Sequence, residues 1–143
     1  MEAERRLLFR QGALFLFLSA VVGLVVAAQA PNVVKWRTVH VSGLMTGLLV
    51  IGLGALWSEV RLADRTRRLT WKLGLTAAWT GLALNVFGAL VNFPGPASDP
   101  GRQPDAAWQM AVFFSLLAII VPATLTSFFL VWRGLSDRGA RPA

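Results

Sequence analysis

Four long apolar segments dominate the chain and limit what it can fold into. They cover residues 7–28, 39–60, 73–93 and 107–132, and the remainder consists of short polar connectors and a C-terminal tail, 133–143. A helix needs about 20 consecutive apolar residues to cross the hydrocarbon core of a bilayer. We therefore predict an all-α membrane protein, a single domain over residues 1–143, built as an up-down bundle of four transmembrane helices.

The first apolar segment also has the features of a secretory signal. Arginines precede it, and an Ala-Gln-Ala sequence at residues 28–30 has the form of a cleavage site. The apolar stretch is longer than a typical signal core, however, and Pro31 directly after the site disfavours cleavage. We expect this segment to be retained as the first transmembrane helix.

The positive charge is distributed unevenly between the two ends of the helices. The net charge is +7, and of the 14 Lys and Arg residues only Lys35, Arg37 and Arg102 fall in the loops 30–38 and 94–106. Cytoplasmic loops carry an excess of Lys and Arg, so we predict cytoplasmic N- and C-termini and outer-face loops at 30–38 and 94–106. We expect the partners of this charge to be anionic lipid headgroups rather than nucleic acid.

Several classes of chemistry are excluded by what the sequence lacks. It contains no cysteine, which rules out disulfides, thiolate metal sites and covalent attachment of haem. It has no nucleotide-binding glycine loop and no zinc-protease motif. The acidic residues lie at or beyond the ends of the apolar segments, so a buried carboxylate relay is not expected.

The few polar residues within the apolar segments fall into two stripes. At about 100° per residue, the second segment aligns its single histidine with small residues, as His40, Gly43, Gly47, Ile51 and Gly54. The third segment has a similar stripe of Gly74, Ala78, Gly81, Asn85, Gly88 and Asn92. Small residues allow close contact between helices in lipid, which accounts for the glycines. The asparagines need another explanation, because an unpaired amide in hydrocarbon is costly.

The predicted topology places these polar groups near one another in depth. His40 and Asn92 fall at the outer ends of their helices, and Asn85 lies about 10 Å deeper at about 1.5 Å per residue. A groove with an imidazole at its mouth and amides along one wall could hold a flat apolar molecule such as a porphyrin. The alternative for His40 is a hydrogen bond to a backbone carbonyl or a lipid headgroup.

Neighbouring residues could complete such a porphyrin site. Lys35 and Arg37 could meet the propionates at the membrane surface, and Gly43 and Gly47 would leave space for the ring. The alternative for Lys35 and Arg37 is that they extend to the interface as cations near helix ends commonly do. The alternative for the glycines is helix contact alone.

Two stretches carry a family resemblance. "WRTVHVSGLMTGLLVIGLG" (36–54) and "LNVFGALVNFP" (84–94) resemble the second and third helices of the styrene oxide isomerase family. The resemblance implies a bacterial inner-membrane protein that binds haem b through one histidine, assembles as a trimer with haem near subunit interfaces, and isomerises aryl epoxides to aldehydes. By position, His40 matches the axial iron ligand and Asn85 matches an asparagine of the third helix.

The chain departs from the family pattern at two positions. Thr46 stands where the family has an asparagine that orients the epoxide oxygen, and Ala89 is nearest to a tyrosine position in a chain that contains no tyrosine. The resemblance therefore supports the haem site more strongly than the substrate chemistry. The residues that it and the polar stripes suggest for catalysis are Asn85, Thr46 and Asn92.

Three functions are compatible with these features. The first is a haem b isomerase that uses ferric iron as a Lewis acid on a small apolar epoxide. The second is a non-enzymatic membrane haem protein, such as a gas sensor or haem carrier, and the third is a helical scaffold or transporter accessory without a cofactor. One histidine leaves the opposite axial position of an iron open, because Met45 lies about 140° from His40 around the helix.

Overall fold

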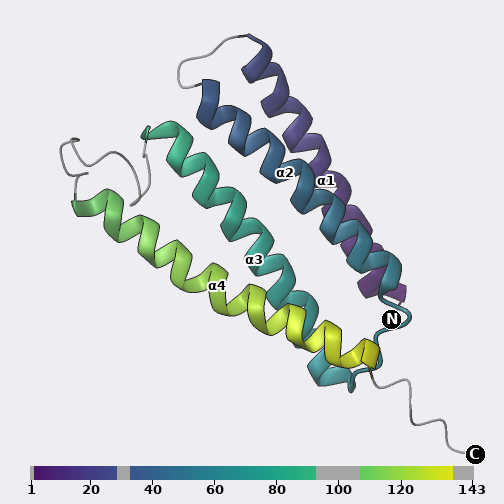
Figure 1. The fold of residues 1–143 in the computed structure, drawn as a ribbon. Coiled ribbons are helices and arrows are strands. Elements are labelled where there is room, and N and C mark those ends of the chain that lie inside the picture. The colour runs from purple at the N-terminus through teal and green to yellow at the C-terminus, as the bar shows by residue number, and fades with distance from the viewer. Residues whose placement is uncertain (1, 29–32, 93–106, 137–143) are drawn as a thin grey trace, which may run out of the picture.

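The computed structural model describes residues 2–28, 33–92 and 107–136. Figure 1 shows four helices, and the described residues contain no strand. In chain order the helices are α1 (Glu2–Ala27), α2 (Val33–Leu56), α3 (Asp64–Leu90) and α4 (Ala107–Ser136). The predicted all-α class is confirmed.

All four helices are long and apolar enough to cross a membrane. The shortest, α2, has 24 residues, which is about 36 Å at about 1.5 Å per residue and exceeds a hydrocarbon core of about 30 Å. Many large apolar side chains point outward, among them Phe17 with 64% of its surface exposed and Leu48 with 62%. An apolar surface of this extent is suited to lipid rather than to water. The protein is therefore a membrane protein with four candidate spans.

All four helices extend beyond the apolar runs of the sequence at one end, and α2 and α3 extend furthest. α2 begins at Val33 and α3 begins at Asp64, so the polar connectors contribute helical turns. The carboxylate of Asp64 lies in the first turn of α3, where it interacts favourably with the unpaired N–H groups of the helix end. Because α2 starts early, His40 lies about two turns inside the helix and not at its end.

Glycines bring α1 and α2 into close contact. A Cβ atom added to Gly12 of α1 would lie 2.9 Å from the carbonyl oxygen of Gly47, and one added to Gly54 of α2 would lie 3.2 Å from the Cβ of Leu8. Side chains at these positions would force the helices apart. The explanation of the α2 glycines as residues of a helix contact is thus confirmed.

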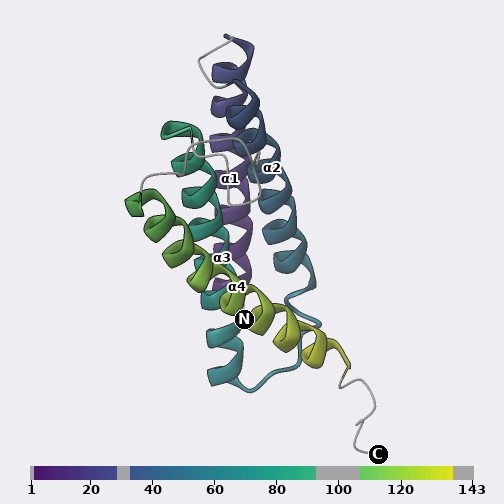
Figure 2. The same cartoon turned by 60° about the vertical axis from the view of Figure 1, so that its left-hand side comes forward.

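α3 joins the α1–α2 pair to α4, as Figure 2 shows from a second direction. The Ser127 hydroxyl of α4 donates to the carbonyl oxygen of Thr70 on α3 at 3.2 Å. One turn further along α3, a Cβ on Gly74 would lie 3.1 Å from the same hydroxyl and 3.8 Å from the Leu53 side chain of α2. α3 is therefore held between α2 and α4 at this level.

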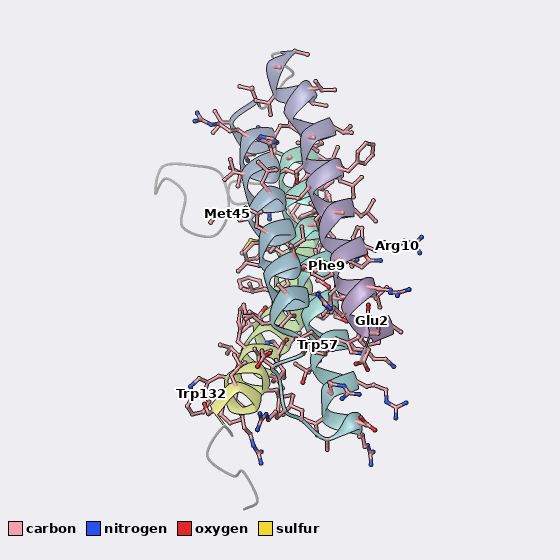
Figure 3. The ribbon with its side chains drawn as sticks, turned by 90° about the vertical axis from the view of Figure 1, so that its right-hand side faces the viewer. Glu2, Phe9, Arg10, Met45, Trp57 and Trp132 are labelled. Atoms are coloured by element: carbon pink, nitrogen blue, oxygen red, sulfur yellow. The ribbon has the colours of Figure 1, made fainter. Side chains whose placement is uncertain are left out.

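The end of the molecule near the N-terminus has a compact apolar cluster with a half-buried ion pair at its edge. Trp57, labelled in Figure 3, is fully buried against Leu8, Val50 and Val60. Its indole Nε1 donates to the Glu4 carboxylate at 3.2 Å, which also accepts from Arg67 Nε at 3.0 Å. These contacts connect the start of α1, the end of α2 and the start of α3.

The directions of the helices alternate along the chain (Figure 1). Closure of the four helices into an up-down bundle, and the cytoplasmic location of both termini, stay predictions.

Candidate functional site

The single histidine lies between α1 and α2. Its imidazole Nδ1 is 2.6 Å from the carbonyl oxygen of Ser19, a residue of α1 with 2% of its surface exposed. The His40 side chain itself is half-buried. The residue is thus anchored to a neighbouring helix and is not fully enclosed by the chain.

A glycine of α1 makes room for the imidazole. A Cβ atom on Gly23 would lie 2.9 Å from Cε1 of His40 and 3.1 Å from its Nδ1. Any side chain at position 23 would therefore collide with the ring or displace it. Ser19 and Gly23 are four residues apart and lie on one face of α1, so a single helix face both accepts the hydrogen bond and fixes the plane of the ring.

The hydrogen bond determines which ring nitrogen is available to a ligand. A carbonyl oxygen can only accept, so Nδ1 of His40 must carry the proton, and the lone pair of the neutral ring lies on Nε2. Histidines that ligate metals commonly donate their other ring N–H to a carbonyl or carboxylate in this way. His40 is therefore in the tautomer that an axial iron ligand requires.

The side chains available as metal ligands suit a metal ion that is already coordinated by a cofactor. The described residues contain no group of three or more His, Cys, Asp or Glu side chains that could hold a bare metal ion. A porphyrin supplies four nitrogens and needs from the protein one axial ligand and an apolar surface. His40, half-buried among apolar helices, meets this requirement.

Gly43 and Gly47 lie inside the contact between α1 and α2. A Cβ on Gly43 would collide with the Ser19 hydroxyl, and one on Gly47 would lie 2.8 Å from Cδ2 of Leu16. Because α1 fills the space beside both glycines, the structure assigns them to helix packing. They act on the site indirectly, by letting α1 approach closely enough for Ser19 to reach His40.

Asn85 lies at the height of His40 on the neighbouring helix. A Cβ on Gly43 of α2 would lie 3.9 Å from Leu82 of α3, so these two residues are at the same height. The helices are antiparallel, so three residues back from Gly43 and three residues on from Leu82 reach the same height again, at His40 and Asn85. The Asn85 side chain is half-buried, and its Nδ2 donates to the carbonyl oxygen of Gly81 at 3.0 Å. The amide oxygen and the second N–H of Asn85 are thus left for other partners.

Thr46 is on the side of α2 that faces α3. Leu53 of α2 lies beside Gly74 of α3. Thr46 precedes Leu53 by seven residues, or two turns, and so shares its face of α2. Gly81 follows Gly74 by seven residues and likewise shares its face of α3. A Cβ on Gly81 would meet nothing within 4 Å. Thr46 is thus on the side of α2 that faces α3, whereas His40 is directed toward α1.

Asn92 has a backbone role in the structure. It follows Val91, the C-cap residue of α3, and has a positive φ of 52°. Asparagine is one of the few residues other than glycine that adopt this left-handed conformation without large strain. Its side chain is exposed, so its position is explained by the end of the helix and not by a contact with His40.

The two cations before His40 lie in the first turns of α2. Arg37 is exposed and one turn from His40 on a similar face, whereas Lys35 is half-buried. Met45, labelled in Figure 3, projects from α2 on the side away from α1 and is 62% exposed. Within one chain, Met45 is therefore not placed beside His40.

Fold and site together define a small polytopic helical membrane protein with one anchored histidine. Residues 4–136, nearly the whole chain, match the family model of styrene oxide isomerase. The chain belongs to the styrene oxide isomerase family. Neither the curated proteins nor the solved structures include a match to it.

Sequence reasoning missed the contribution of α1 to the site. Ser19 and Gly23 lie in an apolar run, where a small residue attracts little attention. Their spacing of four residues is the pattern of a close helix contact, and this pattern was the available signal. It could have identified α1 as the helix that packs against the glycine face of α2.

Proposed function

We propose that the protein is a haem b-dependent isomerase that converts aryl epoxides, such as styrene oxide, to aldehydes. The observation that carries the proposal is the hydrogen bond from His40 Nδ1 to the Ser19 carbonyl, which leaves Nε2 free to bind iron. Family membership supports the reaction class. Arg37 and Lys35, at the end of α2 nearest His40, are suited to hold the two propionates.

The reaction is redox-neutral. A C–O bond of the epoxide breaks, a hydride moves from the oxygen-bearing carbon to its neighbour, and a C=O bond forms with no net gain or loss of protons. When bound, ferric haem supplies a Lewis acid for the epoxide oxygen. The chain needs no buried acid or base for this rearrangement, in agreement with the absence of carboxylates from the middle of its helices.

The helices supply orientation and exclusion of water. The second N–H of Asn85, not used by Gly81, can donate to the epoxide oxygen as negative charge develops on it. The Thr46 hydroxyl is the corresponding donor on α2. The surrounding apolar side chains keep water from trapping the developing carbocation as a diol.

An oligomer completes the site in this proposal. In one chain His40 is directed toward α1, while Thr46 is on the side of α2 that faces α3 and Asn85 belongs to α3. We therefore expect a neighbouring subunit to bring the two sides together. A homotrimer in a bacterial inner membrane, as the family resemblance implies, provides such a neighbour.

A non-enzymatic haem protein is the second candidate function. It is favoured by the departures of the chain from the family pattern. Thr46 replaces an asparagine of that pattern, and the chain contains no tyrosine to match the tyrosine of the third helix. A gas sensor or haem carrier needs His40 but does not need donors for an epoxide oxygen.

Turnover distinguishes the two functions. Detergent-purified protein, saturated with haem b and kept ferric, is incubated with styrene oxide, and the aldehyde is measured by gas chromatography. The isomerase predicts phenylacetaldehyde without diol, and the Met45→Leu variant serves as a control on an exposed position of α2. Stable haem binding with no aldehyde from styrene oxide or other aryl epoxides would leave the sensor or carrier function in its place.

A further inference from the structure

A groove runs along α3, near the start of the helix. Its volume is about 470 Å³, and it is lined by Trp71, Lys72, Leu75, Thr76, Trp79 and Thr80. These residues recur at steps of three and four, so they share one face of α3. Trp79 also contacts α1: its ring packs at a tilt of 40° on Phe15, with the ring centroids 4.6 Å apart, and its Nε1 donates to Gln11 at 3.1 Å.

A row of cations continues this face toward the polar end of α3. Arg65 and Arg68 precede Lys72 by seven and four residues, which places all three on the side of the groove, and all three are exposed. Within the described residues they form no ion pair. Arg67 binds the carboxylates of Asp64 and Glu4.

We infer that this groove binds an anionic phospholipid, a site that is independent of the proposed haem chemistry. The phosphate lies against Arg68 and Lys72, and one acyl chain follows Leu75 and Trp79 into the membrane. Trp79 is seven residues beyond Lys72, about 10 Å deeper along the helix. Polar and apolar parts of the groove thus follow the same order as the headgroup and the chain of a lipid.

A buried indole adds a specific donor at the boundary between the two parts. The Nε1 atom of Trp71 is buried and has no acceptor among the described residues. The Lys72 ammonium lies 5.8 Å from the centre of the same ring. An ester oxygen of the glycerol backbone is an acceptor of the kind that this N–H lacks.

Charge favours a lipid over a second copy of the chain as the occupant. The chain carries 14 cations against seven acids, so another subunit would bring mainly further cations toward Arg65, Arg68 and Lys72. An anionic lipid neutralises them. Each basic side chain near an anionic membrane surface contributes about 1 kcal/mol, which corresponds to roughly a fivefold gain in binding.

The test uses quenching of tryptophan fluorescence by brominated lipids. The protein is reconstituted into phosphatidylcholine vesicles with about 10 mol% of a lipid brominated in the middle of its acyl chain. This lipid is phosphatidylglycerol in one sample and phosphatidylcholine in the other. The site predicts stronger quenching by the brominated phosphatidylglycerol. Trp79→Phe is expected to remove most of this difference, because it removes the ring that lies at the depth of the bromine atoms.

A charge-matched pair of variants separates the site from general attraction to the surface. Arg68→Gln/Lys72→Gln is expected to weaken the preference for phosphatidylglycerol by more than tenfold, whereas Arg5→Gln/Arg6→Gln, which removes the same charge from α1, should leave it nearly unchanged. Equal quenching by the two lipids overturns the inference. Equal losses in both double variants also overturn it, and so does protection of Trp79 from both lipids, which would indicate a second subunit in the groove.

Discussion

The imidazole of His40 donates from Nδ1 to the carbonyl oxygen of Ser19 at 2.6 Å, across the contact between α2 and α1. This bond fixes both the tautomer and the orientation of the only histidine in the chain. A backbone carbonyl cannot be removed by substituting the residue that carries it. The arrangement is therefore best tested through the glycine that makes space for the ring.

The Gly23→Ala variant is expected to lower haem affinity by about 10- to 100-fold, the usual cost of disturbing the partner of a metal-ligating histidine. The new Cβ would lie 2.9 Å from Cε1 of His40 and would turn the ring away from Ser19. Haem titration followed by the Soret band measures the effect. Gly52→Ala is the matched control, since a Cβ there meets nothing within 4 Å; similar losses in both variants would contradict the proposed role of Gly23.

The Asn85→Ala variant is expected to retain haem and to reduce kcat by about 100-fold, the typical cost of losing one hydrogen-bond donor to a developing oxyanion. The half-buried amide of Asn85 donates one N–H to the Gly81 carbonyl, and its second N–H can donate to the substrate. Steady-state rates with styrene oxide, at matched haem occupancy, measure this. An unchanged kcat, or a loss of haem instead of kcat, would exclude Asn85 as an orienting donor.

Substitution of Asn92 separates a catalytic role from a role in the backbone. Its φ of 52° is readily adopted by glycine, so Asn92→Gly should leave both turnover and thermal stability nearly unchanged. Asn92→Val should instead lower stability by about 1 kcal/mol, because β-branched residues are strained in this conformation. A large fall in kcat for Asn92→Gly would show that the Asn92 side chain contributes to catalysis.

The Glu4→Ala variant is expected to destabilise the protein by about 1–3 kcal/mol, since it leaves the buried Trp57 N–H without its acceptor and Arg67 with only the exposed carboxylate of Asp64. Thermal unfolding in detergent measures the change in Tm. Glu2→Ala is the control, because the ion pairs of Glu2 with Arg5 and Arg6 are exposed and contribute little. Equal Tm values for the two variants would show that the buried contacts do not stabilise the fold.

The sequence was sufficient to predict the four helices because bilayer thickness sets a minimum length for each apolar segment. It also predicted close packing along Gly47 and Gly54, since small residues at helical spacing have few other uses in a membrane. It did not reveal which helix would cover that face. The choice of α1 depends on the fit between Gly12, Gly47 and their neighbours, and the spacing of Ser19 and Gly23 was its one periodic sign.

The same limit explains the differences at the candidate site. Helical spacing placed His40 and the glycines on one face, but it could not show that Ser19 would occupy the space beside Gly43. The pattern of asparagines on the third helix was equally ambiguous. Asn85 is within the helix and has donors to offer, whereas Asn92 ends the helix, and the two differ in backbone conformation and not in residue type.

Haem titration of the detergent-purified native protein and of its His40→Ala variant tests the central claim most directly. We expect a Soret band that saturates at one haem per chain in the native protein, and no saturable band in the variant. Free imidazole, added in solution, should restore haem binding to the variant by filling the space of the missing ring. A variant that binds haem with native affinity and an unchanged spectrum, without imidazole, would contradict ligation of the iron by His40.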